Sequence, residues 1–212
     1  MCIRDSYKDR ADSIAKVSDL LAVMAAAQPG HYLAFFPSYS YLQQVWEDFT
    51  ARYPDQPTLC QESAMDEGQR TEFLAQFLAR DGKPLLGFAV LGGVFGEGVD
   101  LTGESLIGVA VVSPGLPQIG PRQEQLRDYF EETRGAGFDY AYRYPGMNKV
   151  LQAAGRVIRT PQDRGVVLLI DDRFLAPDTR RLMPPHWEHL RVVDSADAWK
   201  DELAAFWKKH EP

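Results

Sequence analysis

Four polar residues suited to holding an anion recur at helical intervals in the second half of the sequence. Asn148, Gln152, Arg156 and Arg159 form one stripe of an expected helix, and no acidic residue interrupts it. Gly155 lies beside this stripe, where the lack of a Cβ permits close approach. Arginine binds phosphate oxygens bidentately and stays protonated, so two arginines with an amide suit a triphosphate. The alternative, a helix face that only meets solvent, stays open on this pattern alone.

The charge around this stripe differs from that of the whole chain. The protein has 23 Lys and Arg against 30 Asp and Glu, a formal net charge of -7. Residues 140–165 nevertheless carry five basic residues and one acid, Asp163. The overall charge excludes a histone-like or ribosomal basic protein. Any contact with nucleic acid is therefore expected to use a local basic patch.

A glycine-rich loop, residues 92–100, follows an expected strand. Its glycines allow backbone N–H groups to approach a phosphate without obstruction by side chains. The loop does not fit the G-x-G-x-x-G dinucleotide pattern, and Gly82-Lys83 runs into Pro84 instead of forming a phosphate-binding lysine loop. A tight strand-to-helix turn and an anion site both remain open for this loop.

Metal and nucleophile chemistry have weaker support. An apolar strand ends in Asp171 and Asp172, which imitates a strand that holds Mg²⁺, but no phosphate-binding lysine loop accompanies it. Acids at such a position also pair with arginine, here Arg173. His186 and His189 would share a helical face without a third ligand nearby. We therefore expect no metal site, and we find no convincing Ser-His-Asp or Cys-His arrangement.

These residues belong to a chain in which amphipathic helices alternate with buried strands. The expected helices cover residues 13–27, 39–52, 66–79, 123–134, 148–158 and 196–208, and the expected strands 32–36, 85–90, 106–112 and 166–170, with a weaker candidate at 58–61. This alternation indicates one α/β domain with a doubly wound, mostly parallel sheet. Ligands of such sheets bind in the loops that follow the strands, here after Phe36, Val90, Val112 and Ile170.

Length, cysteine content and hydropathy exclude several classes of protein. The 212 residues suffice for one ordinary domain or two very small ones. Cys2 and Cys60 are too few for a disulfide framework, and they fit a reducing, cytoplasmic location. No apolar run reaches the roughly 18 residues of a membrane helix, so we expect no membrane association. Residues 1–6 do not resemble a signal peptide, and we expect them to be a non-native or truncated start before a domain at 7–209.

Three segments, in order along the chain, resemble the motifs of one enzyme family. Residues 152–159, QAAGRVIR, are similar to motif VI of superfamily 2 helicases, Q-x-x-G-R-x-x-R. Residues 96–100, GEGVD, look like motif V of the DinG/XPD branch, and residues 32–39, YLAFFPSY, look like its motif IV. Residues 137–174 strengthen the match to bacterial DinG-like helicases. The chain thus resembles the C-terminal, second RecA-like motor domain of a superfamily 2 DNA helicase of the DinG/XPD-like branch.

The resemblance implies that motif VI acts on ATP bound between two motor domains. Arg159 would be the arginine finger on the γ-phosphate, with Arg156 beside it and Gln152 polarising or sensing the same phosphate. The Mg²⁺ ligands and the phosphate loop would come from the first RecA-like domain.

The other two motifs would serve the nucleotide and the DNA. The resemblance implies that Asp100 and the backbone of Gly98 contact the nucleotide sugar or link motif V to motif VI, with Glu97 structural or coupling. Ser38 and Tyr39 would face single-stranded DNA through a phosphate hydrogen bond and stacking. The family also implies 5′→3′ translocation and a setting in DNA repair.

Two departures from the family pattern limit what this chain can do alone. Gly96 stands where the branch usually has Ser, so a hydroxyl contact from that position is lost. The chain also lacks a Walker A motif, a DEAH-type box and a four-cysteine motif, which in this family belong to the first motor domain and its insertion. We therefore expect no ATP hydrolysis by this chain alone, and an iron–sulfur cluster only in the missing part.

Two other functions remain as alternatives. Another kind of nucleotide-binding α/β domain, such as a transferase, would bind nucleotide in isolation. A non-catalytic RecA-like docking module would tolerate changes at Arg156 and Arg159 without loss of its partner's ATPase activity.

Overall fold

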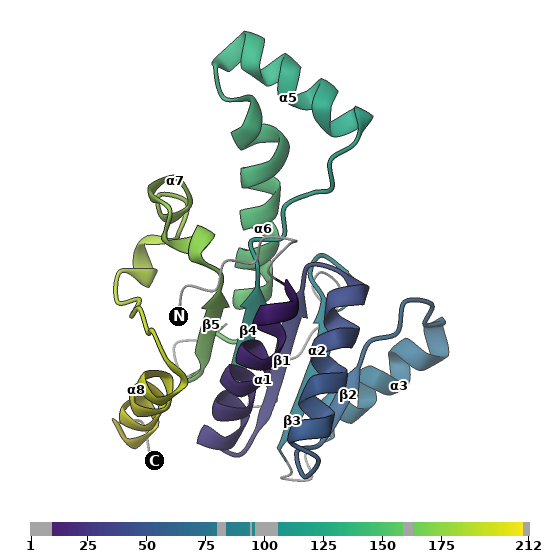
Figure 1. Cartoon of the computed structure of the whole chain (residues 1–212), viewed down its shortest axis with the longest axis vertical. Helices are drawn as coiled ribbons and strands as arrows, with labels where there is room; N and C mark the ends of the chain where they lie inside the picture. The colour runs from purple at the N-terminus through teal and green to yellow at the C-terminus, as the bar shows by residue number, and fades with distance from the viewer. Residues whose placement is uncertain (1–9, 80–83, 94, 96–105, 159–162, 210–212) are drawn as a thin grey trace.

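The chain folds around a five-stranded sheet (Figure 1). The computed structural model describes residues 10–79, 84–93, 95, 106–158 and 163–209. The strands are β1 (His31–Phe36), β2 (Thr58–Cys60), β3 (Leu85–Val90), β4 (Gly108–Val112) and β5 (Val166–Ile170). They pair in the order β2-β3-β1-β4-β5, and every pairing is parallel. The predicted parallel α/β sheet is confirmed.

The central strand explains why the sheet is covered on both faces. All six residues of β1 are buried. Because neighbouring side chains of a strand point to opposite faces, Tyr32 and Phe36 enter one core while Leu33 and Phe35 enter the other. A continuous apolar run of this kind is typical of a strand buried on both sides.

Helices α1 (Arg10–Ala27), α2 (Tyr39–Arg52) and α8 (Ala196–Lys209) pack on the first face. The centre of this core is aromatic. The Phe88 ring stacks on Phe36 with a centroid distance of 5.7 Å and meets the edge of Phe49 at 5.5 Å. These contacts fix α2 over β1 and β3, and α2 begins where β1 ends.

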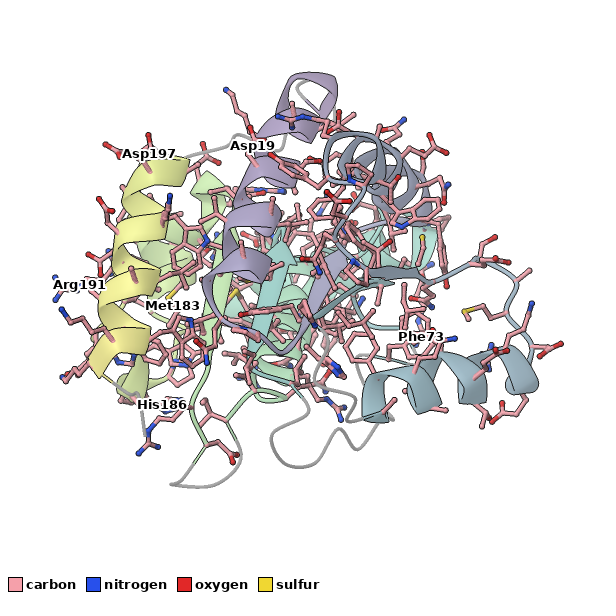
Figure 2. All side chains as sticks on the ribbon, turned by 90° about the horizontal axis from the view of Figure 1, so that it is seen from below. Asp19, Phe73, Met183, His186, Arg191 and Asp197 are labelled. Carbon is pink, nitrogen blue, oxygen red and sulfur yellow. The ribbon has the colours of Figure 1, made fainter. Side chains whose placement is uncertain are left out.

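Helices α3 (Glu67–Leu78) and α6 (Tyr144–Ala154) pack on the other face. In Figure 2, α1 lies above the sheet and α3, which carries Phe73, lies below it. On α6 the buried side chains include Met147, Val150 and Ala153. The two-sided cover places α6 across the sheet from α1 and α2.

A helical arm stands beyond the edge at which the strands end (Figure 1). It consists of α5 (Pro121–Arg134) and the π-helix η1 (Asp139–Arg143), which runs directly into α6. The ring of Phe130 stacks on that of Tyr140 at 4.2 Å, and no residue of α5 is buried. Arg143 also pairs with Asp178 at 3.4 Å, which ties the arm to the short helix α7 (Pro177–Arg180).

Several elements differ from the sequence-based expectations. The strand expected over residues 106–112 is observed as β4, which begins only at Gly108. A Cβ at Gly108 would lie 2.4 Å from the Tyr32 ring. The π-helix, α7 and the 3-10 turns η2 (Asp172–Leu175) and η3 (Pro185–Trp187) were not predicted. Across the described part of the chain, no helix is both long and apolar enough to cross a membrane.

Candidate functional site

The turn from β1 into α2 places Ser38 and Tyr39 at the carboxyl end of the central strand. Ser38 is the N-cap of α2, and its Oγ accepts a hydrogen bond from the Tyr41 backbone N–H at 3.3 Å. Among the described residues, no acceptor for its own hydroxyl hydrogen is found. Tyr39 is 37% exposed, so part of its large side chain faces solvent. The two residues predicted to meet DNA therefore lie together at one edge of the sheet.

A buried amide that the sequence did not reveal connects Tyr39 to the neighbouring strands. Gln61, directly after β2, is only 6% exposed. Its side chain donates to the Tyr39 hydroxyl at 3.0 Å and accepts from the Val90 backbone N–H at 2.8 Å. One side chain thereby joins the ends of β2 and β3 to the start of α2. A lone glutamine after a weak strand carries no pattern that would have identified it.

The loop that follows β3 lies against α6. Gly92 has a φ of +75°, and a Cβ there would lie 2.8 Å from Cδ of Lys149. Glycine is therefore required for both its backbone conformation and the close approach of the lysine. The glycine-rich loop thus starts in contact with α6, the helix that carries the first residues of motif VI. The motif V residues Gly96, Glu97, Gly98 and Asp100 lie outside the described residues.

Both predicted bounds of the helix over residues 148–158 are wrong. It begins at Tyr144 and ends at Ala154, because Gly155 takes a φ of -65° and ψ of -2° and closes the last turn. The structure therefore divides the predicted polar stripe. Asn148 and Gln152 are exposed on α6, whereas Arg156 lies in the turn after it, with its backbone N–H bonded to Ala153. Arg159 lies outside the described residues.

Because α6 crosses one face of the sheet, the motif residues lie at two opposite edges of the sheet. Near its start, Gly146 lies against the carbonyl of Pro114, just after β4. Just beyond its end, Val157 lies against Gly165, which precedes β5. Arg156 is therefore at the amino edge of the sheet, and Tyr39 is at the carboxyl edge. The strand-end loops alone do not gather all the predicted functional residues.

The close contact at Gly146 leads to a prediction about stability. In a free helix, alanine would be favoured over glycine by about 1 kcal/mol. Here a Cβ at Gly146 would lie 2.5 Å from the Pro114 carbonyl oxygen. We expect Gly146→Ala to lower the free energy of unfolding by about 1–3 kcal/mol, because α6 must shift. Urea denaturation measures this, with Gly120→Ala as control, since nothing lies within 4 Å of that position. A Gly146→Ala variant as stable as the wild type would contradict the packing described for α6.

Asp171, directly after β5, is engaged in an ion pair. The Asp171 side chain is fully buried, and its oxygens accept from Nε of Arg173 at 2.9 and 3.1 Å. Arg173 also donates to the Ser113 hydroxyl at 2.9 Å. The alternative in which Asp171 pairs with Arg173 is confirmed. Among the described residues, no group of three or more His, Cys, Asp or Glu is placed to hold a metal ion.

Cys60 is not suited to act as a nucleophile. Burial, together with the nearby Glu62 and Glu47 carboxylates, raises the pKa of its thiol to about 12. The thiolate is the reactive form, so almost none is present near neutral pH.

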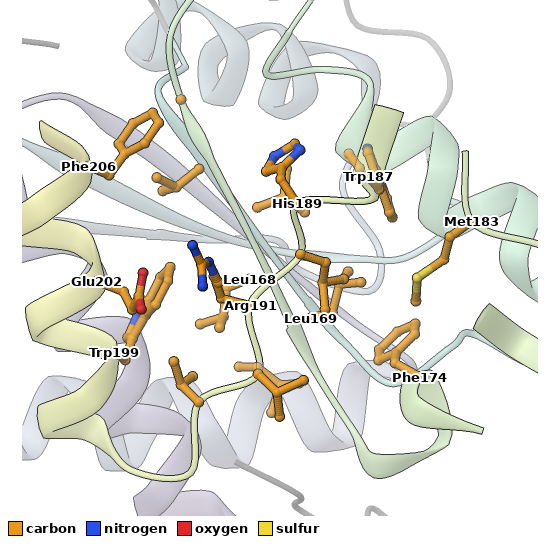
Figure 3. A pocket seen from close by; sticks show the side chains of 18 of the residues that line it. Leu168, Leu169, Phe174, Met183, Trp187, His189, Arg191, Trp199, Glu202 and Phe206 are labelled. Carbon is orange, nitrogen blue, oxygen red and sulfur yellow. The ribbon is translucent and has the colours of Figure 1, made fainter. Parts of the chain in front are cut away.

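A cavity of about 640 Å³ lies along the outer side of β5 (Figure 3). The side chains labelled on its walls include Trp199, Glu202 and Phe206 of α8, together with Trp187, His189 and Arg191 from the segment before that helix. The cavity is mainly apolar and also touches Ala154 and Gly155. The sequence did not predict it, because its lining comes from segments without a shared periodicity. It does not include Ser38 or Tyr39.

Comparisons with known proteins agree with this arrangement. The family model of the helicase C-terminal domain matches residues 21–190. Regulator of telomere elongation helicase 1 from Bos taurus is 30% identical over 93% of this chain and 18% of its own length. ATP-dependent DNA helicase chl-1 from Caenorhabditis elegans is 30% identical over 72% of this chain and 19% of its own length. A solved XPD helicase has the same fold, with a TM-score of 0.66, 20% identity, and coverage of 84% of this chain and 32% of that chain.

The match, the sheet order and the motif residues define a RecA-like domain of a helicase. The chain belongs to the helicase C-terminal domain family. It spans about a fifth of the length of the curated relatives named above.

Proposed function

We propose that this domain supplies the trans-acting half of an ATP-dependent DNA motor. ATP and Mg²⁺ would bind between it and a first RecA-like domain, which would supply the phosphate loop and the Mg²⁺ ligands. Arg159 would be the arginine finger, with Arg156 and Gln152 close to the same phosphate. Gly98, Asp100 and Glu97 would serve the nucleotide or its coupling to motif VI.

Single-stranded DNA would cross the carboxyl edge of the sheet at Ser38 and Tyr39. A serine hydroxyl with its hydrogen available suits a phosphate oxygen, and a half-exposed tyrosine ring suits a base or sugar. Translocation would run 5′→3′ by alternate closure and opening of the two domains. A cytoplasmic location and a role in DNA repair belong to the same proposal.

The observation that carries this proposal is the position of α6. Near the start of α6, Gly146 lies against the Pro114 carbonyl, and Lys149 in the middle of the helix touches the loop after β3. Arg156 follows the end of the same helix. A helix packed across one face of the sheet thus joins the proposed DNA edge to the arginines proposed to meet ATP. A packed element of this kind can transmit a change at one edge to the other.

Substitution of Ser38 tests the DNA edge. Aspartate at this position keeps an N-cap acceptor for the Tyr41 N–H but places a negative charge where a DNA phosphate would lie. We expect Ser38→Asp to weaken binding of a fluorescent oligothymidylate to this chain about tenfold at low salt, measured by fluorescence anisotropy. Ser38→Thr keeps both the cap and the hydroxyl and is the matched control. Unchanged affinity of Ser38→Asp would place the DNA elsewhere.

A further inference from the structure

We propose that Gln61 is a positioning residue that turns the Tyr39 hydroxyl into an outward hydrogen-bond donor for a phosphate of single-stranded DNA. This inference rests on the proposed function, because it assumes that Tyr39 faces DNA. It adds a residue from outside the three helicase motifs. It also assigns the Tyr39 hydroxyl the role of a hydrogen-bond donor, so that this group binds an anionic acceptor in preference to another donor.

The orientation of the Gln61 amide follows from its partners. The Val90 backbone N–H is a donor, so the Gln61 atom 2.8 Å from it must be the oxygen. The other amide atom, 3.0 Å from the Tyr39 hydroxyl, is therefore the nitrogen. The backbone N–H of Gln61 donates to the Phe88 carbonyl at 2.9 Å, which fixes the residue against β3. The amide has little freedom to reverse.

The direction of the Tyr39 hydroxyl hydrogen follows in turn. Because the Gln61 amide nitrogen donates to the phenolic oxygen, the hydroxyl hydrogen must point to a different acceptor. Within the described part of the chain, no acceptor for this hydrogen is found, and Tyr39 is 37% exposed. The hydroxyl is thus held as a donor at the carboxyl edge of the sheet, next to Ser38. Phosphate oxygens are acceptors only, and hydrogen bonds to charged acceptors are the stronger ones.

Burial explains why Gln61 acts reliably in this role. With 6% exposure, its amide cannot exchange its partners for water at low cost. Gly93 lies beside it, where a Cβ would be 3.7 Å from the amide nitrogen and 3.2 Å from the Val90 carbonyl. Three elements, β2, β3 and α2, therefore hold the tyrosine in one orientation before DNA arrives. Such preorganisation strengthens binding by removing the entropy cost of ordering the ring.

A double-mutant cycle on DNA affinity tests this role. The full 212-residue chain is used with a fluorescent oligothymidylate of about 20 nucleotides, longer than a typical site of about 4–16 nucleotides. We expect Tyr39→Phe to weaken binding about five- to tenfold and Gln61→Met about threefold. The double variant is expected to bind no worse than Tyr39→Phe alone, because Gln61 acts through the hydroxyl that phenylalanine lacks.

A second variant covers the case in which Gln61→Met fails to fold. Gln61→Glu keeps an acceptor for the Val90 N–H, but its carboxylate would accept the Tyr39 hydroxyl hydrogen and draw it inward. We expect this variant to bind DNA as weakly as Tyr39→Phe. The negative charge that Gln61→Glu adds is present in both the wild-type and the Tyr39→Phe backgrounds. Comparing the loss of DNA affinity in the two backgrounds therefore isolates the part of that loss that depends on the Tyr39 hydroxyl.

The ¹³Cζ resonance of Tyr39, assigned by its loss in Tyr39→Phe, gives a readout that does not depend on DNA. We expect Gln61→Met to shift this resonance. If Tyr39→Phe binds DNA more weakly and the losses of affinity of the two single variants multiply in the double variant, Gln61 does not act through the Tyr39 hydroxyl. That result would overturn the role of Gln61 but keep the contact of Tyr39 with DNA. A shifted resonance with DNA affinity unchanged in every variant would instead overturn the proposed DNA contact of Tyr39, and the positioning role with it.

Discussion

Replacing Arg159 by alanine is expected to lower DNA-stimulated ATP hydrolysis about 10³- to 10⁵-fold in a protein that joins this domain to a first motor domain. An arginine finger stabilises the charge that develops on the transferred phosphoryl group, and water replaces it poorly. Arg159 lies outside the described residues, so this expectation rests on its place in motif VI. Steady-state phosphate release in the presence of single-stranded DNA measures the effect.

Two control variants separate the finger from general loss of charge. Arg159→Lys keeps the positive charge but not the planar fork, and we expect it to recover little of the activity. Arg164→Ala removes an exposed arginine from the same basic stretch and is expected to leave turnover within about twofold of the wild type. Turnover of Arg159→Ala at the wild-type rate would remove the finger role from this residue.

The second large effect is expected in the aromatic core at Phe88. This side chain is fully buried, and it contacts both Phe36 of β1 and Phe49 of α2. We expect Phe88→Ala to lower the free energy of unfolding by about 3–5 kcal/mol, because it removes apolar contacts and leaves a cavity. Urea denaturation of the 212-residue chain measures this loss.

Phe88→Leu is the matched control for this cavity. Leucine fills much of the same volume, so we expect its cost to be less than half that of alanine. If Phe88→Ala cost less than about 1 kcal/mol, α2 would not be held on β1 and β3 as described. The position described for Ser38 and Tyr39 at the start of α2 would then be contradicted as well.

The parts of the fold that could be predicted from the sequence are those with a strong local pattern. The strand over residues 85–90 and the helix over residues 39–52 were predicted at their observed bounds, because apolar runs and turn residues delimit them. The strand over residues 166–170 was also predicted at its observed bounds. Ser38 was correctly placed at the start of a helix that follows a buried strand.

The parts that could not be predicted depend on tertiary contacts. Residues 139–147 are rich in aromatic side chains but have no clean helical period, so η1 and the start of α6 were missed. The predicted helix ran on through Gly155 to residue 158, because Val157 continues the apolar spacing of α6. In the structure that side chain packs against Gly165 from a turn instead. Gln61 was missed because its partners, Tyr39 and Val90, lie far from it along the chain.

In the proposed function, the contacts with ATP and with DNA are divided between two edges of the sheet. Arg156 lies at the amino edge of the sheet, and Ser38 and Tyr39 lie at the carboxyl edge. No phosphate-binding lysine loop was found in the sequence for an ATP bound next to the arginines. A first RecA-like domain would complete the nucleotide site, and α6 would connect that site to the DNA edge.

ATP hydrolysis by the 212-residue chain, alone and joined to a first motor domain, tests this division most directly. Both proteins are assayed with and without single-stranded DNA. We expect no turnover by the chain alone and turnover stimulated by DNA in the joined protein, with loss of that stimulation in Arg156→Ala. Turnover by the chain alone would mean that it contains a complete nucleotide site, and it would contradict the assignment of this domain as one half of a motor.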